Sequence, residues 1–509
     1  MMDERVTERL RCTALRAKLL TAEEAALLIH DGMTVAVGGF TPSGCPKAVP
    51  AALARQVRES GRQVRITLLS GASTGSDIDT ELGSAGVIAR RAPYMTSAAL
   101  RAEVNEGRTA YQDAHLGSMA QNVRCGRYGK IDVAVIEACA VTEDGGIVPT
   151  TAVGCAQTFA ALAERVIVEL NLSQPAELEG FHDIYRVGDP PFRRPIPLTS
   201  PGERIGKTYI PCAPDKIAAV VVTGRPDRPR PLAEPDENSR KIASHIVRFL
   251  EGERDAGRLS AGTVPLQSGV GSVANAVLEG LRASDFRHLT FYSEVMQDAV
   301  LDLMDCGKAD FCSATSLSVS GGAMTRLLQR LEDYRDKIVL RDSEVSNSPE
   351  VIRRLGVIAM NTAVEADLYG NVNSSHMCGS RIYNGIGGSG DYARNASVSV
   401  FMTVSTAKGG RISSIVPCVT HVDHTEHDVD VIVTEQGLAD LRGCSPRERA
   451  ERVIEHCAHP DYRPLLREYY RRACQMCGPV QTPMLLDECF SMHRRFQKTG
   501  TMMPGDEED

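Results

Sequence analysis

The sequence lacks a long apolar run. The first twenty residues mix apolar residues with charged ones such as Asp3, Arg5 and Glu8, so we expect no signal peptide. No window elsewhere is apolar over the roughly 20 residues that a membrane-spanning helix needs. An excess of positive charge is also missing, because the net charge is −8 and the pI about 5.9. We therefore expect a cytoplasmic protein that binds neither membrane nor nucleic acid. The negative net charge does not exclude an anionic small ligand, because local backbone donors can bind phosphate or carboxylate inside an acidic protein.

Several signatures of metal and hydrolase sites are absent as well. The 15 cysteines have no framework spacing, which is typical of free thiols in a reducing compartment. The pair Cys474 and Cys477 has no second CxxC to complete a metal site. The cluster between His421 and His427 is not an HExxH motif, and there is no Gly-x-Ser-x-Gly elbow or Walker loop. We expect no metal; a metal at the histidine cluster and a redox role for the cysteine pair are the alternatives.

What is present is the composition of a globular protein with more than one core. The chain has 509 residues, 42% of them hydrophobic and 24% charged, which is too long for one ordinary domain. Short β-branched runs alternate with Ala- and Leu-rich helical stretches, which predicts α/β architecture with largely parallel sheet. The clearest segments are the strands Met33 to Val37, Val64 to Leu69, Ile131 to Glu137 and Arg165 to Leu170, and the helix Lys47 to Val57.

A proline-rich, charged stretch, Gly224 to Pro235, interrupts this pattern and reads as a connector. After it the pattern restarts in the same order. The segments that begin at Val35, Ile66 and Val133 are similar, in the same order, to those that begin at Val264, Leu289 and Gly356. An internal duplication explains this order; generic α/β similarity is the alternative. We predict two similar open α/β domains, residues 1–223 and 238–509, joined by a linker at 224–237, with the active site in the cleft between them.

One carboxylate stands out at the end of a predicted strand. Glu294, in FYSEVMQD, occupies the place where the first half has Gly71. Ligands of open α/β sheets bind at the carboxyl ends of strands, so Glu294 is a candidate for chemistry. The alternative is an acidic residue that stabilises a helix N-terminus.

Glycine-rich turns accompany this glutamate. Gln267-Ser268-Gly269-Val270-Gly271 follows a strand and precedes a helix, so its backbone N–H groups are placed to bind a phosphate or an oxyanion. It is not a full GxGxxG, which weakens a dinucleotide interpretation. The segment Asn384 to Asp391 holds four glycines and lets backbone approach a ligand closely, unless it is only a flexible loop. Lys408, before Gly409, is a candidate phosphate contact.

Together these segments resemble the acetyl-CoA hydrolase/transferase family of class I CoA-transferases. The resemblance spans nearly the whole chain. It is carried by GFTPSGCPKAVP from Gly39, EDGGIVPT from Glu143, QSGVGSVANAVLEGL from Gln267, SEVMQD from Ser293, VSNSPEVIRRLG from Val345, EADLYGNVNS from Glu365, NGIGGSGDYARN from Asn384, STAKGG from Ser405, VTEQGLADLRG from Val433 and HPDYRPLL from His459. The family pattern has Tyr in place of Cys45.

The resemblance implies a role for each matched residue. Glu294 is the expected nucleophile, which passes through an acyl-glutamyl anhydride to a glutamyl-CoA thioester. The backbone amides of Val270 and Gly388 form the expected oxyanion hole, and Asn347 orients Glu294. Arg228 and Glu435 lie around the carboxylate substrate. CoA contacts are expected at Gln267, Ser268, Gly269, Val270, Gly271, Asn384, Gly388 and Lys408.

The implied activity moves CoA from succinyl-CoA to acetate, with CoA as a substrate, no tightly bound cofactor, and a homodimer. Glutamate, with an ordinary pKa near 4.3, is expected to be ionised at neutral pH and to need no base. The alternatives are an acetyl-CoA hydrolase, a propionyl-CoA:succinate transferase and a silent CoA-binding regulator. The physiological acid pair, the direction of flux and the role of Phe181 to Pro201 are not readable from the sequence.

Overall fold

The computed structural model describes residues 4–228, 234–259 and 265–505, and the chain divides into two compact units. Unit 1 comprises Met1–Pro231, Thr290–Asp305 and Ala309–Leu355. Unit 2 comprises Leu232–Leu289, Cys306–Lys308 and Gly356–Asp509. Neither unit is a continuous stretch, and about sixty residues after position 289 group with unit 1 rather than with the chain that flanks them. The two domains predicted from the repeat therefore stay a prediction. Part of the predicted linker, 229–233, lies outside the described residues.

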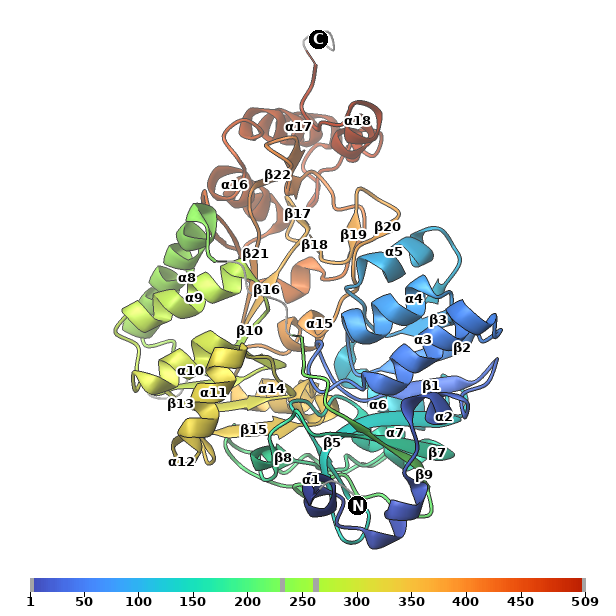
Figure 1. The fold of residues 1–509 in the computed structure, drawn as a ribbon. Helices are drawn as coiled ribbons and strands as arrows, with labels where there is room; N and C mark the ends of the chain where they lie inside the picture. Colours follow the sequence, from blue (N-terminus) through green and yellow to red (C-terminus); the bar gives the residue numbers. More distant parts are fainter. Residues whose placement is uncertain (1–3, 229–233, 260–264, 506–509) are drawn as a thin grey trace. The chain divides into compact units, whose positions relative to one another are not determined.

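A largely parallel sheet forms the first part of unit 1 (Figure 1). Its order is β4-β3-β2-β1-β5-β7-β9, and β6 pairs antiparallel with β5. All nine residues of β5 are buried, as is typical of a parallel strand covered on both faces. The strands are β1 (Thr34–Val37), β2 (Ile66–Ser70), β3 (Ile88–Ala92), β4 (Ala110–Tyr111), β5 (Val133–Val141), β6 (Ile147–Pro149), β7 (Arg165–Asn171) and β9 (Ile217–Thr223).

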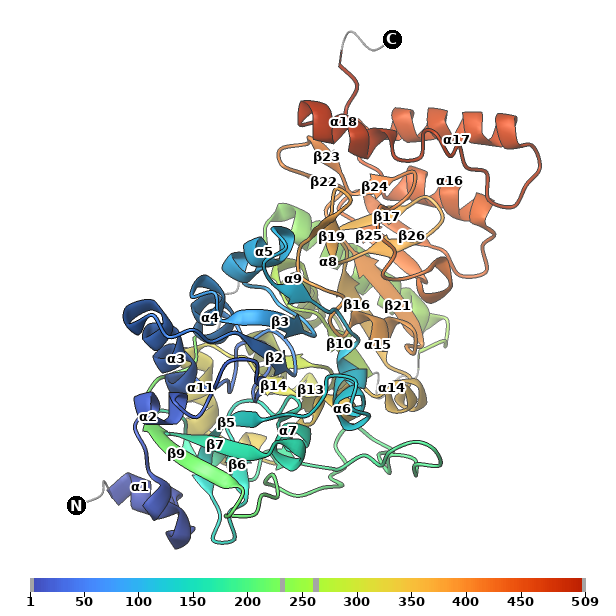
Figure 2. The same ribbon diagram turned by 90° about the vertical axis from the view of Figure 1, so that its right-hand side faces the viewer.

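The strand order reverses between β1 and β5. Right-handed crossovers then place the helices that follow β1, β2 and β3 on one face and the later helices on the other. Figure 2 shows α3 and α4 on one side of β2 and β3, and α6 and α7 on the other side. The reversal point is where open α/β sheets bind ligands. The helices are α1 (Glu4–Arg9), α2 (Ala22–Ala26), α3 (Ala48–Ser60), α4 (Glu81–Ser84), α5 (Ala98–Asn105), α6 (Leu116–Arg124) and α7 (Ala156–Leu162).

The later residues of unit 1 add the strand order β11-β13-β15-β8. β8 comes from the Phe181 to Pro201 segment and pairs parallel with β15, so this segment completes a sheet edge. A two-stranded ribbon, β12 with β14, leads away from β11. The elements are β8 (His182–Asp183), β11 (Leu289–Tyr292), β12 (Val295–Met296), α10 (Asp298–Asp305), β13 (Ala309–Ala314), β14 (Ser316–Leu317), α11 (Gly321–Gln329), α12 (Leu331–Tyr334), β15 (Ile338–Arg341), α13 (Ser343–Ser346) and α14 (Pro349–Leu355).

Unit 2 holds the parallel strands β10, β16, β21 and β25, with β26 antiparallel to β25. Small ribbons follow β16 and β21. The elements are α8 (Glu237–Asp255), β10 (Pro265–Ser268), α9 (Ser272–Ala283), β16 (Ile358–Thr362), β17 (Glu365–Asp367), β18 (Val372–Asn373), β19 (His376–Met377), β20 (Arg381–Ile382), α15 (Ser389–Ala393), β21 (Val398–Met402), β22 (Thr406–Ala407), β23 (Ile412–Ser413), β24 (Ile415–Val416), β25 (Val431–Thr434) and β26 (Gly437–Asp440).

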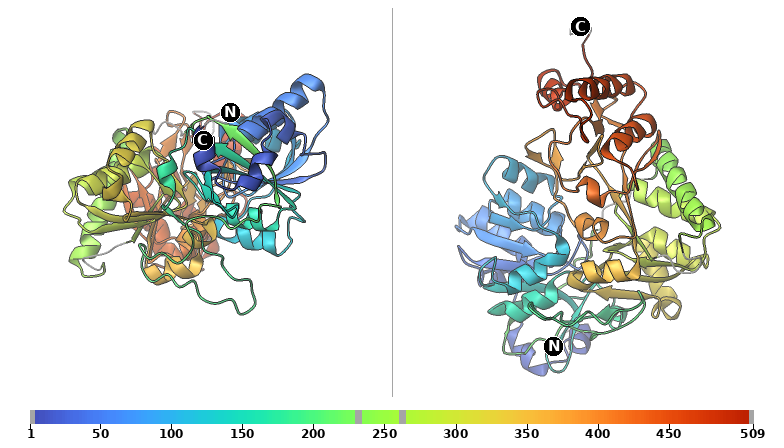
Figure 3. Two further views of the ribbon diagram at one scale, coloured as in Figure 1. Left: turned by 60° about the horizontal axis from the view of Figure 1, so that its bottom comes forward. Right: turned by 180° about the vertical axis from the view of Figure 1, so that it is seen from behind.

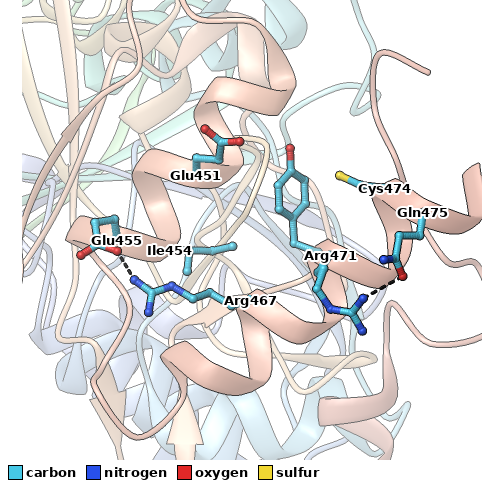
Figure 4. Close-up of a pocket in the computed structure, with 8 residues that line it drawn as sticks. Glu451, Ile454, Glu455, Arg467, Arg471, Cys474 and Gln475 are labelled. Carbon is cyan, nitrogen blue, oxygen red and sulfur yellow. Dashed lines mark hydrogen bonds and ion pairs between the residues drawn. The ribbon is translucent and has the colours of Figure 1, made fainter. Parts of the chain in front are cut away.

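Three helices end unit 2: α16 (Pro446–His456), α17 (Arg463–Cys477) and α18 (Ser491–Thr499). Figures 2 and 3 show α16 and α17 side by side, and their buried faces share one apolar cluster with Val453, Leu466 and Ala473. A surface pocket of about 640 Å³ opens between them (Figure 4). Its two arginines bind neighbouring side chains, Arg467 binding Glu455 and Arg471 binding Gln475. None of the predicted site residues lines it.

The predicted α/β class with parallel sheets is confirmed. In each unit a strand that ends in a glycine-containing loop pairs parallel with a later strand of the same unit, β1 with β5 and β10 with β16. These are the strands that the internal repeat matched. No helix in the part of the chain that the structure describes is long and apolar enough to cross a membrane.

Candidate active site

Glu294 lies at a junction between two strands. β11 is buried along its whole length, and the chain leaves it at Ser293 and enters β12 at Val295. The backbone carbonyl of Glu294 accepts N–H bonds from Thr315 at 2.9 Å and Ser316 at 3.0 Å. Because both donors belong to the start of β14 and the residue before it, the main chain of Glu294 is fixed from a neighbouring strand. The carboxylate therefore stands at a strand's carboxyl end on a rigid support.

The side chain of Glu294 is held by Asn347. The Nδ2 atom of Asn347 donates to Glu294 Oε1 at 2.8 Å. Asn347 is fully buried and follows α13, where its N–H donates to Ser343 O at 2.8 Å. Gly117 of α6 packs against it so closely that a Cβ at this position would lie 2.3 Å from the Asn347 carbonyl oxygen. The structure thus brings together the two residues that the resemblance pairs.

Burial raises the pKa of Glu294 to about 7, and the Asn347 hydrogen bond opposes that rise. No cation contributes to this shift. The expectation of an ordinary, fully ionised glutamate is therefore wrong. Near pH 7 about half of the carboxyl groups are protonated, because the charged form is poorly solvated at this site. A carboxylate that is poorly solvated is also a more reactive nucleophile once it is ionised.

Arg228 belongs to the same unit but does not share the burial of Glu294. Its side chain is 73% exposed, and its Nη1 lies 3.9 Å from Asp77 Oδ1. Asp77 sits in the turn of π-helix Ser76–Thr80, which follows β2. Arg228 comes five residues after the end of β9. The sequence analysis did not single out Asp77, whose only signal is its place in a loop after a strand.

In unit 2 the turn at 267–271 is built on the pair β10 and β16. The Gln267 side chain is buried, donates to Asn361 Oδ1 at 3.1 Å and accepts from Met360 N–H at 3.1 Å. Gly269 N–H donates to Met360 O at 3.1 Å. These bonds use Gln267 and Gly269 to hold the turn to β16. Val270, with 48% of its surface exposed, follows these anchored residues and is separated from the start of α9 by Gly271.

The second glycine-rich turn is supported by the histidine cluster. Asn384 Oδ1 accepts the Gly385 N–H at 2.7 Å, and buried Gly388 precedes α15. His424 Nε2 lies 3.1 Å from the Ser389 hydroxyl, which donates to Ile386 O at 2.7 Å. The histidine therefore braces this turn. Among the described residues no group of three or more His, Cys, Asp or Glu side chains is arranged to hold a metal.

Lys408 and Glu435 take separate places in unit 2. The Lys408 side chain is exposed, and its ammonium lies 5.2 Å from the centre of the Phe496 ring. Glu435 follows β25 and accepts bonds from both the N–H, at 2.8 Å, and the hydroxyl of Ser405. Gln436 Nε2 donates to the same carboxylate at 3.0 Å. Glu435 thus organises polar groups at the ends of β21 and β25.

A buried charge cluster in unit 1 was missed by the sequence analysis. Lys47 Nζ lies 2.5 Å from Glu137 Oε2 and 2.8 Å from Asp227 Oδ1. Lys47 and Glu137 are almost fully buried. The signal in the sequence was weak, because each residue is polar within or beside an apolar stretch and the three are far apart along the chain.

Comparison with known proteins decides the family. The N-terminal domain model of the acetyl-CoA hydrolase/transferase family matches residues 3–222, and its C-terminal domain model matches residues 323–470. The chain belongs to the acetyl-CoA hydrolase/transferase family. It is an enzyme of this family, and the resemblance found in the sequence is confirmed.

The relatives of this family member carry different activities in their names. The chain is 52% identical to succinyl-CoA:acetate CoA-transferase of Clostridium kluyveri, over 98% of this chain and 92% of that protein. It is 43% identical to acetyl-CoA hydrolase of Candida albicans, over 98% of both. It is also 43% identical to propanoyl-CoA:succinate CoA transferase of Escherichia coli, over 95% of this chain and 98% of that protein.

Solved structures agree on the fold. RipA from Yersinia pestis matches with a TM-score of 0.71 at 24% identity, over 90% of this chain and 98% of that one. A 4-hydroxybutyrate CoA-transferase from Porphyromonas gingivalis matches with a TM-score of 0.62 at 21% identity, over the same shares. Family and fold are therefore established together, while the acid used is a separate question.

Proposed function

We propose that the chain is a CoA-transferase that moves CoA from succinyl-CoA to acetate through a glutamyl-CoA intermediate on Glu294. The observation that carries the proposal is the Glu294 carboxylate, fixed at a strand end and bound by Asn347 at 2.8 Å. The 52% identity to a succinyl-CoA:acetate CoA-transferase supports this acid pair.

The proposed chemistry needs no proton transfer. Glu294 attacks the thioester carbonyl, and the C–S bond breaks. The CoA thiolate is released, and the acyl group stays on Glu294 as an acyl-glutamyl anhydride. The thiolate then attacks the glutamyl carbonyl and releases the first acid, which leaves glutamyl-CoA. The second carboxylate reverses both steps. A thiol with a pKa of roughly 8.5 is a good enough leaving group to depart as the anion.

The remaining roles follow the resemblance. Asn347 holds Oε1, so Oε2 of Glu294 is the attacking atom. Val270 and Gly388 are the proposed oxyanion donors, each of which is typically worth about 3–4 kcal/mol of barrier. Arg228 is proposed to bind the carboxylate substrate and Glu435 to order the polar groups near it. The proposed CoA contacts are Gln267, Ser268, Gly269, Val270, Gly271, Asn384, Gly388 and Lys408.

One assay separates this proposal from its alternatives. The purified protein is given succinyl-CoA with and without acetate, and acetyl-CoA and free CoA are measured separately. Acetate-dependent acetyl-CoA, without matching release of free CoA, is the expected result. Propionyl-CoA with succinate tests the third activity in the same format. A rate of transfer to acetate below that of CoA release would reject the proposal.

Hydrolysis is the second candidate function, and one observation favours it. A carboxyl group with a pKa of about 7 is matched to neutral pH, as a general base for water has to be. A curated hydrolase is 43% identical to the chain. If free CoA appears at the same rate without acetate, Glu294 acts on water or its intermediate is open to water.

We predict that the transfer rate depends on pH through Glu294. Only the carboxylate attacks, and its pKa is raised to about 7, so kcat/KM should rise with pH through about 7 and level off about one unit above. At pH 6 about a tenth of the enzyme is active. Asn347→Ala removes the hydrogen bond that opposes the rise in pKa, so its profile should move to higher pH. Initial rates between pH 5.5 and 9 check this; a flat profile below pH 7 contradicts it.

The cytoplasmic location and the homodimer are also part of this proposal, with CoA as a substrate and no tightly bound cofactor. Light scattering of the purified protein at micromolar concentration tests the dimer. A monomer would remove that part of the proposal and leave the chemistry intact.

A further inference from the structure

The segment that carries Arg228 is anchored by the residue before it. Asp227 Oδ1 lies 2.8 Å from Lys47 Nζ, and its Oδ2 accepts the Thr151 hydroxyl at 2.5 Å. The N–H of Gly44 donates to both oxygens at 3.3 Å. The Arg228 side chain, in contrast, is 73% exposed. A surface ion pair restrains a long exposed side chain only weakly. The position of the Arg228 side chain therefore depends on where its backbone is held.

Lys47 is itself fixed to the centre of the sheet. Its ammonium bonds Glu137 Oε2 at 2.5 Å and Cys45 O at 2.8 Å, and Glu137 lies on β5 at the point where the strand order reverses. On the neighbouring strand, Glu169 accepts N–H bonds from Lys47 at 2.7 Å, from Ala48 at 2.9 Å and from Val49 at 2.6 Å. An anion at a helix N-terminus is stabilising, so the start of α3 is locked to β7.

The charge state of the cluster suits this anchoring. Burial alone lowers the pKa of Lys47, but Glu137 and Asp227 outweigh burial and raise it above its ordinary value. Lys47 is therefore charged at every relevant pH. A buried ammonium is retained only when carboxylates compensate it, and Asp227 supplies one of them from the segment after β9.

Hydrogen bonds connect the same cluster to the backbone of Glu294. Thr151, whose hydroxyl binds Asp227, accepts the Leu317 N–H at its carbonyl at 2.8 Å. Leu317 belongs to β14, which pairs with β12 directly after Glu294. Ser316, the first residue of β14, and Thr315 before it also donate the two N–H bonds to the Glu294 carbonyl. One residue thus joins the segment of Arg228 to the strand that fixes Glu294.

We infer that Asp227 is a positioning residue: with Lys47 and Thr151 it sets Arg228 relative to Glu294 for the carboxylate substrate. This inference rests on the proposed transferase function and on the proposed role of Arg228. It predicts that Asp227 affects the binding of the free acid and leaves acyl-CoA binding alone. It also predicts that this effect passes through Arg228.

The test is a double-mutant cycle with Asp227→Asn and Arg228→Ala, measured with succinyl-CoA and acetate. Asp227→Asn is expected to raise the KM for acetate about tenfold, as the loss of a hydrogen bond to a charged group typically does, with the KM for succinyl-CoA within twofold. In the Arg228→Ala background the same change should have almost no further effect on the acetate KM, because the two act as one unit.

One matched pair and one further variant keep the test decisive if Asp227→Asn folds poorly. Thr151→Val removes the hydroxyl that binds Asp227, and Thr151→Ser keeps it, so only the former should raise the acetate KM. Asp77→Asn removes the carboxylate near the Arg228 side chain without touching the anchor. A larger rise in the acetate KM from Asp77→Asn than from Thr151→Val would overturn the inference.

The failures of the inference and of the proposed function are distinguishable. If the wild-type protein makes no acetyl-CoA from acetate, the proposed function fails and the inference fails with it. The inference alone is wrong if the wild-type protein transfers CoA but Asp227→Asn leaves the acetate KM unchanged. It is also wrong if the effects of Asp227→Asn and Arg228→Ala on the acetate KM are fully additive. Equal rises in both KM values would show a merely structural role and also reject it.

Discussion

Glu294→Ala is expected to abolish acetate-dependent formation of acetyl-CoA, with a loss of at least about 10,000-fold, as is typical when a covalent nucleophile is removed. Every proposed step forms or breaks a bond at this carboxylate. The CoA adduct, sought by intact-mass and peptide analysis after incubation with succinyl-CoA, should map to Glu294 in the wild-type protein and be absent from the variant.

Glu294→Gln is the matched control for this prediction. Its amide keeps the size of the side chain and can accept the Asn347 N–H that lies 2.8 Å from Oε1, but it is a poor nucleophile. It should fold as the wild-type protein does and be as inactive as the alanine variant. A Glu294→Ala variant that retains a tenth of the activity, or an adduct on another residue, would rule out Glu294 as the nucleophile.

Arg341→Met is expected to have the largest effect on stability. Arg341 is fully buried and binds the Asp183 carboxylate, Ser313 Oγ at 2.8 Å and Pro201 O at 3.1 Å, with a further bond to Glu203 O. The variant leaves the buried Asp183 charge without its guanidinium, which typically costs about 3–5 kcal/mol. Because β8 and the chain to Glu203 depend on these bonds, unit 1 should unfold at lower urea concentration.

Arg354→Met provides the comparison. Arg354 also holds the segment after β8, through Ile196 O at 2.7 Å and Leu198 O at 3.0 Å, but it is exposed, and within the described part of the chain it forms no ion pair with a buried carboxylate. A loss of about 1 kcal/mol or less is expected there. Because two units need not unfold together, hydrogen exchange of residues 181–206 should accompany the urea curves. Equal effects of the two substitutions would contradict the buried-charge argument.

The fold was predictable where the sequence pattern is local. The β-branched run at Arg165 to Leu170 is the strand Arg165–Asn171. The apolar residues Ile242, Ile246, Val247 and Leu250 recur at helical spacing, and all of them except the half-buried Val247 lie on the buried face of α8. Glu294 was identified as a strand-end carboxylate, and its contact with Asn347 was expected from the resemblance. Local periodicity carries this information because burial on one face of an element fixes the spacing of apolar residues.

The missed features are long-range. Lys47 and Glu137 are 90 residues apart, and Arg341 and Asp183 are 158 apart, so no local pattern connects the partners. The raised pKa of Glu294 likewise follows from the burial of its carboxyl group, which depends on residues from several segments. The grouping of residues 290–305 and 309–355 with unit 1 is also a property of packing, which a repeat in the sequence does not report.

The interleaving of the two units bears on how the protein is made. Unit 1 needs residues up to Leu355, and unit 2 begins before them, at Leu232. During synthesis, which proceeds at about 5–20 residues per second, α8 and α9 therefore emerge before unit 1 can close. α8 packs against β25 and β26, so this packing cannot form until the chain passes Asp440. Chaperones that bind exposed amphipathic helices would have their longest time of action on α8 and α9, and a ribosome that stalls once Leu355 has left its exit tunnel would display a complete unit 1 beside an incomplete unit 2.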